Sequence, residues 1–341
     1  MLAATIVFSA ATLTGCKKDP SNNNQWGAET LTFKVNNSSD EFILKKVGGG
    51  DYSMEYMYES QVKTVKGTLS DFYICPVEVT NKLWNDVMGW RPEGQTNNGD
   101  SYHVSNVNYY DIVKEGGFID KLNTLCANQL PSGKRFALPT EAQWEYAARG
   151  GQKSMGYKYA GSNTIDEVAW YAGNSDGSTH PVGLKQPNEL RLFDMTGNVW
   201  EWTRDNFVYF DKLTPDQGLD YVCTAENNYR VNRGGSYGTR QMGLETAYHT
   251  WLGMHQSYIN RGLRLALVND FNEDKLVEPT QPDNLLSITV NNGTVGYYLP
   301  MVEVKGGDYE LVYERIGEQK TFTGTLSDFY ILPNRNDELH L

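Results

Sequence analysis

The chain has 341 residues, a net charge of −12, 39% hydrophobic content and 12% aromatic content. This composition provides enough apolar surface for a sizeable core, so we expect a globular rather than a disordered protein. The acidic balance excludes nucleic acid and anionic membrane surfaces as favoured partners, because both are bound through clustered Lys and Arg. With 33 Gly, 22 Tyr and 8 Trp, the fold is expected to be rich in loops and held by aromatic packing.

Residues 1–15 are small and apolar, and they lead into Leu13-Thr14-Gly15-Cys16, which resembles a bacterial lipobox. In such a motif the signal peptide is cut before the Cys, which is then acylated. We therefore expect residues 1–15 to be a lipoprotein signal peptide, Cys16 to be the lipidation site and the polar stretch 16–30 to be a tether. The alternative is an apolar N-terminus that matches by chance, since no Lys or Arg precedes the apolar core.

A lipid anchor holds a protein to a bilayer without a spanning helix, and no later segment approaches the ~20 apolar residues that a span requires. The expected location is the bacterial cell envelope, lipid-anchored at the outer membrane or in the periplasm. Removing Cys16 from the count leaves Cys75, Cys126 and Cys223. Three cysteines permit at most one intrachain bridge, so disulfides are not expected to be the framework of the fold.

Alternation of apolar and polar residues around Gly and Asp turns predicts strands from Leu31 to Tyr73. Part of this stretch recurs near the C-terminus, because 49–52 and 67–74 match 306–309 and 324–331 at a constant offset of 257 (307 − 50). Either a second tandem domain is incomplete or the second copy is a separate module; we favour the first, since an isolated hairpin buries too little to stand alone. The predicted organisation is a domain at 31–268, a linker at 269–286 and a partial repeat at 287–341.

Three helical segments are predicted between the strands. The first follows Thr80, which can cap it, and places Leu83 and Trp84 on an apolar side. A second stretch near 109–129 is interrupted at Gly116-Gly117. The third begins after Thr140, which forms a capping box with Gln143, and ends at Gly150.

Glu141 and Glu145 lie four residues apart on the third helix, so a carboxylate pair for acid/base chemistry is one interpretation. The alternative, which we favour, is that Glu141 complements the helix N-terminus and Glu145 is solvated or paired with Arg149.

The stretch from Arg191 to Arg204 combines two acids, Asp194 and Glu201, with a Gly197-Asn198 turn and a probable strand that carries Trp200 and Trp202. A Gly turn lets several carboxylate and carbonyl oxygens converge on a hard cation such as calcium. On the sequence alone we favour the alternative, an ordinary turn followed by a strand with a solvent-facing Glu.

Several motifs in order resemble the formylglycine-generating enzyme family, also called sulfatase-modifying factors. They are found at 138–151, 170–174, 180–183, 187–188, 192–202, 233–237 and 262–266. The resemblance implies an α+β fold, an irregular domain related to C-type lectins with little regular secondary structure, here followed by the partial β repeat.

The resemblance also implies structural calcium as the cofactor. By position, Asp194 and Glu201 would supply side-chain oxygens and Gly197 and Val199 backbone carbonyls. A second calcium site would map onto Asn174 and Asp176, with Ser175 supplying a backbone carbonyl, in a loop that is shorter than in the enzymes.

The enzymes of this family hold a copper ion through two cysteines a few residues after the Gly-Gly-Ser-Tyr motif. In this chain those positions are Thr239 and Leu244. Because neither can replace a thiolate, which is the ligand type that Cu(I) selects, we expect no copper and no formylglycine-generating activity.

The leading hypothesis is a non-catalytic, calcium-stabilised envelope lipoprotein that binds a glycan, peptide or protein through a groove within 236–258. The groove residues are Ser236, Tyr237, Arg240, Tyr248, His249, Trp251, His255 and Tyr258, whose aromatic and polar content suits recognition. The alternative is a metal-dependent oxidoreductase of the same family with an altered metal centre. His249 and His255, six residues apart, are either part of such a site or ordinary surface histidines.

Overall fold

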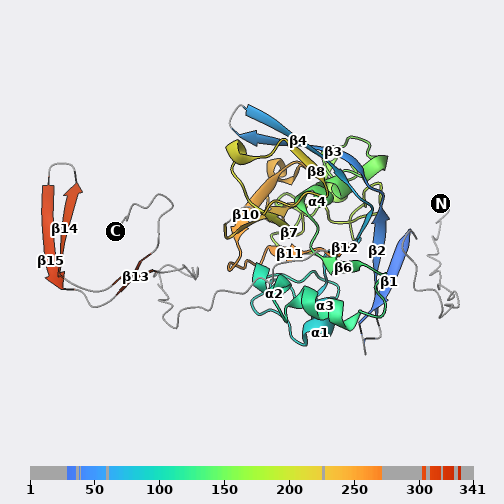
Figure 1. The fold of residues 1–341 in the computed structure, drawn as a ribbon, viewed down its shortest axis with the longest axis horizontal. Helices are drawn as coiled ribbons and strands as arrows, with labels where there is room; N and C mark the ends of the chain where they lie inside the picture. Colours follow the sequence, from blue (N-terminus) through green and yellow to red (C-terminus); the bar gives the residue numbers. More distant parts are fainter. Residues whose placement is uncertain are drawn as a thin grey trace, which may run out of the picture.

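The computed structural model describes residues 29–35, 38, 40–58, 61–224 and 227–270, followed by four strands between 302 and 331. Residues 29–270 form an α+β body in which three sheets and five short α-helices are joined by long loops (Figure 1). This confirms the predicted fold class. Cys16, the predicted signal peptide, most of the tether and most of the linker lie outside the described residues. None of the described helices has the length and apolar character needed to cross a membrane.

The largest sheet joins the two ends of the body. Its strand order is β1 (Thr30–Lys34), β2 (Glu41–Val47), β5 (Phe72–Ile74), β12 (Ala266–Asn269) and β6 (Lys134–Ala137). Strand β12 runs antiparallel to both of its neighbours, so Ala266 lies opposite Ile74 on one side and Ala137 on the other. The N-terminal strands are therefore completed by the last strand of the body.

Two smaller sheets carry the candidate sites. One consists of β3 (Gly50–Tyr58), β4 (Gln61–Leu69) and β8 (Asp216–Leu219). The other has the order β10 (His249–Gly253), β9 (Tyr229–Arg233), β7 (Trp200–Asn206) and β11 (Arg261–Leu263). Strand β11 is parallel to β7, with Leu263 opposite Trp202, so Arg264 follows directly beside the strand that carries Glu201.

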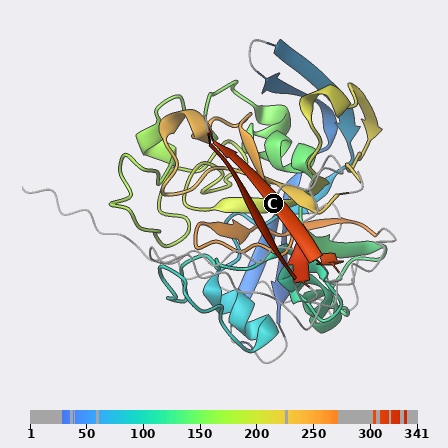
Figure 2. The same ribbon diagram turned by 90° about the vertical axis from the view of Figure 1, so that its left-hand side faces the viewer.

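The predicted helices form, with the predicted caps. Helix α1 (Asn81–Met88) begins after Thr80, whose hydroxyl accepts from the Leu83 N–H at 3.2 Å. The second stretch is two helices, α2 (Tyr109–Val113) and α3 (Phe118–Leu125), separated at the glycines. Helices α1 to α3 gather at one end of the body, and the β3–β4 hairpin projects at the opposite end (Figures 1 and 2). The shorter elements are α5 (Ile165–Val168) and three 3-10 turns, η1 (Gly151–Lys153), η2 (Phe210–Lys212) and η3 (Gln241–Leu244).

Helix α4 (Glu141–Ala148) is buried along its whole length, unlike an amphipathic surface helix. The Thr140–Gln143 capping box is present, but all eight helical residues are buried. Glu145 is only 1% exposed and pairs with Arg149 at 2.7 Å, so of the two predicted alternatives the structure shows the ion pair and not the solvated side chain. A buried carboxylate at this position requires cationic partners from elsewhere in the fold.

Aromatic side chains fill the core on both sides of the large sheet. Trp84 of α1 stacks on Phe118 of α3 with ring centroids 4.9 Å apart. Trp144 of α4 belongs to the second cluster, together with apolar residues of β3 and β4. Among the described residues, Cys75, Cys126 and Cys223 are not joined by a disulfide.

The last four strands form two antiparallel pairs. Strand β13 (Val302–Val304) pairs with β16 (Phe329–Ile331), and β14 (Asp308–Arg315) pairs with β15 (Glu318–Thr325). These strands fall within the predicted partial repeat. The boundaries proposed for the linker and for the repeat stay predictions.

Candidate functional site

The turn predicted to clamp a cation leads into β7 through left-handed backbone. Asp194 and Asn198 have φ of 55° and 57°, and Gly197 has φ of 86°. A Cβ on Gly197 would lie 2.2 Å from the Trp170 carbonyl oxygen, so only glycine fits. Val199 is fully buried between this turn and the strand.

Glu201 is fully buried, and both of its carboxylate oxygens are bound by protein groups. Arg264 donates to Oε1 at 2.7 Å through Nη2 and to Oε2 at 3.0 Å through Nε. Trp144 donates its indole N–H to Oε2 at 2.6 Å. The structure therefore gives Glu201 an ion pair as its principal contact.

Asp194 lies beside a second buried acid, Glu78, that the sequence did not suggest. Asp194 Oδ2 accepts from the Gly183 N–H at 2.6 Å, and Glu78 Oε1 accepts from the Asn198 amide at 3.0 Å. The other oxygens, Asp194 Oδ1 and Glu78 Oε2, accept from no N–H or hydroxyl in the described part of the chain, although a hydrogen bond between the two carboxyls acts to lower the pKa of Asp194. Burial raises the pKa of both carboxyls, and the charge of Asp194 raises that of Glu78 further.

These four side chains, Glu78, Asp194, Glu201 and Arg264, form what we call the Arg264 cluster. If all of its carboxyls are ionised, it carries an excess of two negative charges in the interior. Buried charge of this kind is tolerated only when protons or a cation neutralise it. Within the described residues no three His, Cys, Asp or Glu side chains converge as a ready-made metal cage, so a cation here would need backbone carbonyls or water as well.

The residues of the second predicted calcium site lie in one turn but do not present free side-chain oxygens inward. Asn174 Oδ1 accepts from the Tyr171 N–H at 3.0 Å. The Ser175 hydroxyl donates to the Tyr237 carbonyl at 2.9 Å, and Asp176 is exposed with φ of 54°.

The residues predicted to line one groove are distributed over two sides of β10. His249 and Trp251 contact Phe207: the Trp251 ring stacks on it with centroids 4.2 Å apart, and the His249 ring meets it edge-on at 6.2 Å. Tyr209 packs against the same ring at 5.4 Å. We call Phe207, Tyr209, His249 and Trp251 the β10 aromatic surface; Tyr209 and Trp251 are 49% and 43% exposed.

The other predicted groove residues lie elsewhere. Tyr248 contacts Trp200 at 6.0 Å, and the Arg261 guanidinium lies 5.2 Å over the same indole. Tyr258 accepts from the Arg261 N–H through its carbonyl. The remaining members are Ser236, which is buried, Tyr237 and His255, which are half-buried, and Arg240, which is exposed.

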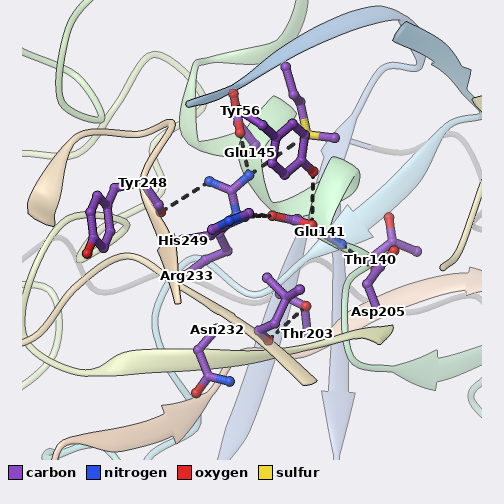
Figure 3. A network of polar contacts seen from close by, with 12 residues as sticks. Tyr56, Thr140, Glu141, Glu145, Thr203, Asp205, Asn232, Arg233, Tyr248 and His249 are labelled. Carbon is purple, nitrogen blue, oxygen red and sulfur yellow. Dashed lines mark hydrogen bonds and ion pairs between the residues drawn. The ribbon is translucent and has the colours of Figure 1, made fainter. Parts of the chain in front are cut away.

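His249 of the β10 aromatic surface also belongs to a buried ionic network (Figure 3). Glu141 Oε1 accepts from His249 Nδ1 at 2.8 Å and lies 3.0 Å from Arg233 Nε, while its Oε2 accepts from the Tyr56 hydroxyl at 3.0 Å. Arg233 also pairs with Glu145. We call Glu141, Glu145, Arg233 and His249 the Arg233 cluster.

Arg233 also forms hydrogen bonds with the segment that precedes β10. Its Nη1 donates to the carbonyls of Thr246 and Tyr248, at 2.9 and 3.2 Å. Burial by itself would raise the pKa of Glu141, but Arg233 and then His249 lower it to about 2. Glu141 is therefore ionised and holds the His249 ring in place.

A cavity of about 20 Å³ lies between this network and β7, enough for about one water molecule. Asp205 faces it and accepts from the backbone N–H groups of Glu141 and Cys223, at 2.7 and 2.9 Å. Burial, and then the charge of Glu141, raise the pKa of Asp205 to about 6. Asp205 and Arg233 were not predicted as site residues, because neither lies in a local sequence pattern that indicates burial.

Comparison with known proteins identifies the fold. The model of the sulfatase-modifying factor enzyme 1-like domain matches residues 29–268. The chain belongs to the sulfatase-modifying factor family. It is 35% identical to the chaperone protein LppX of Paenibacillus barcinonensis over 253 residues, 62% of this chain and 83% of that protein. It is 28% identical to the formylglycine-generating enzyme of Mus musculus over 60% of this chain and 55% of the enzyme.

A solved structure shows the same fold. Treponema denticola variable protein 1 aligns with a TM-score of 0.58 and 29% identity, over 70% of this chain and 98% of that one. The fold of this sulfatase-modifying factor domain is thus shared with proteins that carry different names.

In this family member the two positions assigned to copper ligands have ordinary structural contacts. The Thr239 hydroxyl accepts from the Ser236 N–H at 2.9 Å and lies 3.0 Å from the Ser236 hydroxyl. Leu244 is 1% exposed and packs in a small apolar cluster with Tyr159 and Ile165. A Cβ on Gly235 would lie 2.2 Å from a Leu244 methyl carbon, so the turn and the leucine fit one another closely.

Proposed function

We propose that this sulfatase-modifying factor domain is a non-catalytic, calcium-stabilised binding protein of the bacterial cell envelope, which holds a polypeptide partner against the β10 aromatic surface. The observation that carries the proposal is the pair of residues at the copper-ligand positions. Thr239 completes a hydrogen-bonded turn and Leu244 fills an apolar cluster, so neither offers the soft donor that Cu(I) requires.

The β10 aromatic surface supports a binding role. Trp251 and Tyr209 are rigid, half-exposed rings packed around a buried Phe207, and such rings bind partners at a low cost in conformational entropy. Glu141 and Arg233 fix His249 at the edge of this surface. A polypeptide is the favoured partner among the glycan, peptide and protein alternatives, because the related Paenibacillus protein is named a chaperone.

The Arg264 cluster supports the calcium part of the proposal. Among the described residues, no N–H or hydroxyl donates to the buried oxygens Asp194 Oδ1 and Glu78 Oε2, and a divalent cation would neutralise the excess charge around them. We propose that these two oxygens bind calcium together with the backbone carbonyls of Gly197 and Val199. The family resemblance assigns these two carbonyls to a calcium site. Glu201, bound by Arg264 and Trp144, fits a supporting role better than that of a direct ligand. The loop at 174–176 is kept as the candidate for a second calcium ion.

The envelope location is likewise a proposal. It is supported by the lipobox-like sequence that ends in Cys16. A lipid on that residue would place the binding surface at a membrane without contributing to the surface itself.

A holding assay tests the binding role. A chemically unfolded client protein is diluted into buffer with and without the full chain, and its aggregation is followed by light scattering. We expect suppression of scattering by the wild type and a loss of most of that suppression in Trp251→Ala. Trp90→Ala is the matched control, because Trp90 is equally exposed at 42% but follows helix α1. Suppression that is equal in the two variants would contradict the assigned surface.

The oxidoreductase alternative requires a second measurement. The full chain is supplied with Cu(I), oxygen and a peptide that carries a sulfatase-type cysteine, with the mouse formylglycine-generating enzyme as positive control. We expect no oxygen uptake above the protein-free rate and an unchanged peptide mass. Conversion of the peptide by the wild-type chain would overturn the non-catalytic proposal.

A further inference from the structure

Arg261 is a half-buried cation that none of the described acids neutralises. Arg264, on the same strand exit, is paired with Glu201, but Arg261 forms no such pair, although the chain has 42 Asp and Glu against 30 Lys and Arg. Burial lowers the pKa of the Arg261 guanidinium to about 10, and Tyr258 opposes that shift. Because a partly buried charge without a counter-charge costs free energy, this residue is a candidate for binding an outside group.

The guanidinium of Arg261 uses few of its donors within the body. Its Nη1 donates to Asn260 Oδ1 at 2.9 Å. Its Nε is covered and has no acceptor among the described residues. The Nη2 atom has no acceptor there either and is not one of the covered atoms, so it faces solvent. The outer end of the guanidinium therefore keeps N–H donors for a group that comes from solution.

Aromatic rings surround this guanidinium. It lies over the Trp200 indole, 5.2 Å from the ring centroid, and the Tyr248 ring meets the same indole at 6.0 Å. Trp200 is 6% exposed, whereas Tyr248 is 46% exposed. A guanidinium that lies over a ring face keeps its N–H edge available for a second partner. The rings also keep water from part of the cation, which strengthens a charge-assisted hydrogen bond at that edge.

The group that complements this arrangement is a carboxylate. A carboxylate is planar and accepts two N–H groups of a guanidinium side by side, and its single negative charge balances that of Arg261. The net charge of −12 on the chain disfavours anions that carry several charges, such as phosphate. The exposed ring of Tyr248 suits a carboxylate that is carried next to an apolar or aromatic group.

We propose that Arg261, Trp200 and Tyr248 form a second binding site, the Arg261 site, which takes a carboxylate group of the polypeptide partner. The choice of a polypeptide rests on the proposed function, whereas the choice of a carboxylate rests on the unpaired guanidinium. The carboxylate belongs either to the C-terminus of the partner or to an Asp or Glu side chain. Both sources present the same planar anion to the Nη atoms of Arg261.

The Arg261 site differs in its contacts from the β10 aromatic surface. Tyr248 and His249 are consecutive residues, yet the Tyr248 ring contacts Trp200 whereas the His249 ring contacts Phe207. A substitution of Arg261 therefore leaves the rings of the β10 aromatic surface in place. The two sites can be tested one at a time.

NMR of the arginine side chains tests carboxylate binding directly. The full chain is labelled with ¹⁵N-arginine, and the Nε–H signal of Arg261 is assigned from its absence in Arg261→Lys. The probe is N-acetylphenylalanine, with N-acetylphenylalaninamide as its uncharged control, at constant ionic strength. We expect a saturable shift of the Arg261 signal with the acid and binding of the amide that is weaker by at least about tenfold, because the amide forms no charge-assisted hydrogen bond. No saturable shift with the acid, or an equal response to the amide, would overturn the proposal.

Matched arginine variants show whether the effect belongs to this residue. Binding of the same acid is compared by ligand-observed NMR in Arg261→Leu and in Arg240→Leu, which removes an equal charge from an exposed position. Arg261→Leu should lose most of the binding and melt at or above the wild-type temperature, because it removes a charge that no acid pairs with. Arg261→Gln is the second variant if Arg261→Leu does not fold. Equal losses at positions 261 and 240, or retained binding in a folded Arg261 variant, would refute the assignment.

Two pairs of peptides identify the source of the carboxylate. A peptide with a free C-terminus is compared with its amide, and an amidated peptide with one central Glu is compared with its Gln counterpart. A preference for the acid in either pair that Arg261→Leu abolishes supports the site and identifies the source, whereas no preference in both pairs overturns it. Trp251→Ala should leave these preferences unchanged. Failure of the holding assay with an intact preference therefore counts against the proposed function alone, and the reverse result counts against the Arg261 site alone.

Discussion

The Arg264 and Arg233 clusters are both buried arrangements of acids around one arginine, but their charges balance differently. In the Arg233 cluster, Glu141 is paired with Arg233 and hydrogen-bonded to His249, and Glu145 is paired with Arg233 and Arg149. In the Arg264 cluster, the guanidinium faces Glu201, while Glu78 and Asp194 each keep one oxygen that accepts from no N–H or hydroxyl of the described residues. The charges of the Arg233 cluster are neutralised by protein groups, whereas the Arg264 cluster needs protons or a cation.

This difference separates two tasks. The balanced cluster fixes the His249 ring and the carbonyls of Thr246 and Tyr248, so it shapes a surface without outside help. The unbalanced cluster joins the turn at Gly197, the segment before α1 and the end of β11. Its stability depends on the protons or cations that it binds from solution. We therefore expect this cluster to respond more strongly to pH and to metal ions than the Arg233 cluster.

Removal of each arginine gives the largest effects. Arg264→Met leaves three buried carboxyls without a cation, so we expect a loss of about 3–5 kcal/mol in the free energy of unfolding. Arg233→Met should cost less, because Glu145 keeps Arg149 and Glu141 keeps His249. Urea unfolding of the two variants under one condition measures the order.

A double variant serves as the control for the larger effect. Glu201→Gln in the Arg264→Met background removes the negative charge that Arg264 no longer neutralises. It should restore part of the lost free energy of unfolding. A greater loss in Arg233→Met than in Arg264→Met would contradict the charge balance assigned to the two clusters.

Calcium provides the next effect in size. A ligand that binds only the folded state stabilises it by about 4 kcal/mol when its concentration is a thousand times Kd. We expect chelator to lower the melting temperature of the wild type, and Glu78→Gln or Asp194→Asn to reduce that response. Glu141→Gln should leave the response to chelator intact, because Glu141 belongs to the balanced cluster. An identical wild-type melt with and without chelator would remove calcium from the proposal.

The sequence predicted the parts of the molecule that depend on neighbours along the chain. The Thr140–Gln143 capping box, the Thr80 cap and the break at Gly116 each involve groups three or four residues apart. The family resemblance supplied the fold and placed Asp194 at the turn. Local chemistry and ordered motifs were sufficient for these features.

The composition of the clusters could not be predicted, because distant strands assemble them. Glu78 stands between two valines, and only contact with Asn198, 120 residues away, shows that it is buried and bonded. Glu145 has Arg149 within one helical turn, yet its burial follows from Arg233, 88 residues away. The groove expected within 236–258 stays a prediction; its sequence did not show that Tyr248 contacts Trp200 whereas His249 contacts Phe207.

The smallest effect is a pH dependence within the balanced region. The folded pKa of Asp205 is raised to about 6 from an ordinary value of 3.8, so its stabilising proton is fully bound below about pH 4 and is lost as the pH rises through 6. At about 1.4 kcal/mol per pKa unit, stability should fall by about 2–3 kcal/mol between pH 4 and 6. Asp205→Asn should remove this slope, whatever its effect on absolute stability, and the exposed Asp216→Asn should retain it. Urea titrations in saturating calcium are the appropriate measurement, because the raised pKa values of Glu78 and Asp194 would otherwise add a slope of the same sign. A slope that persists in Asp205→Asn would assign the pH dependence to another group.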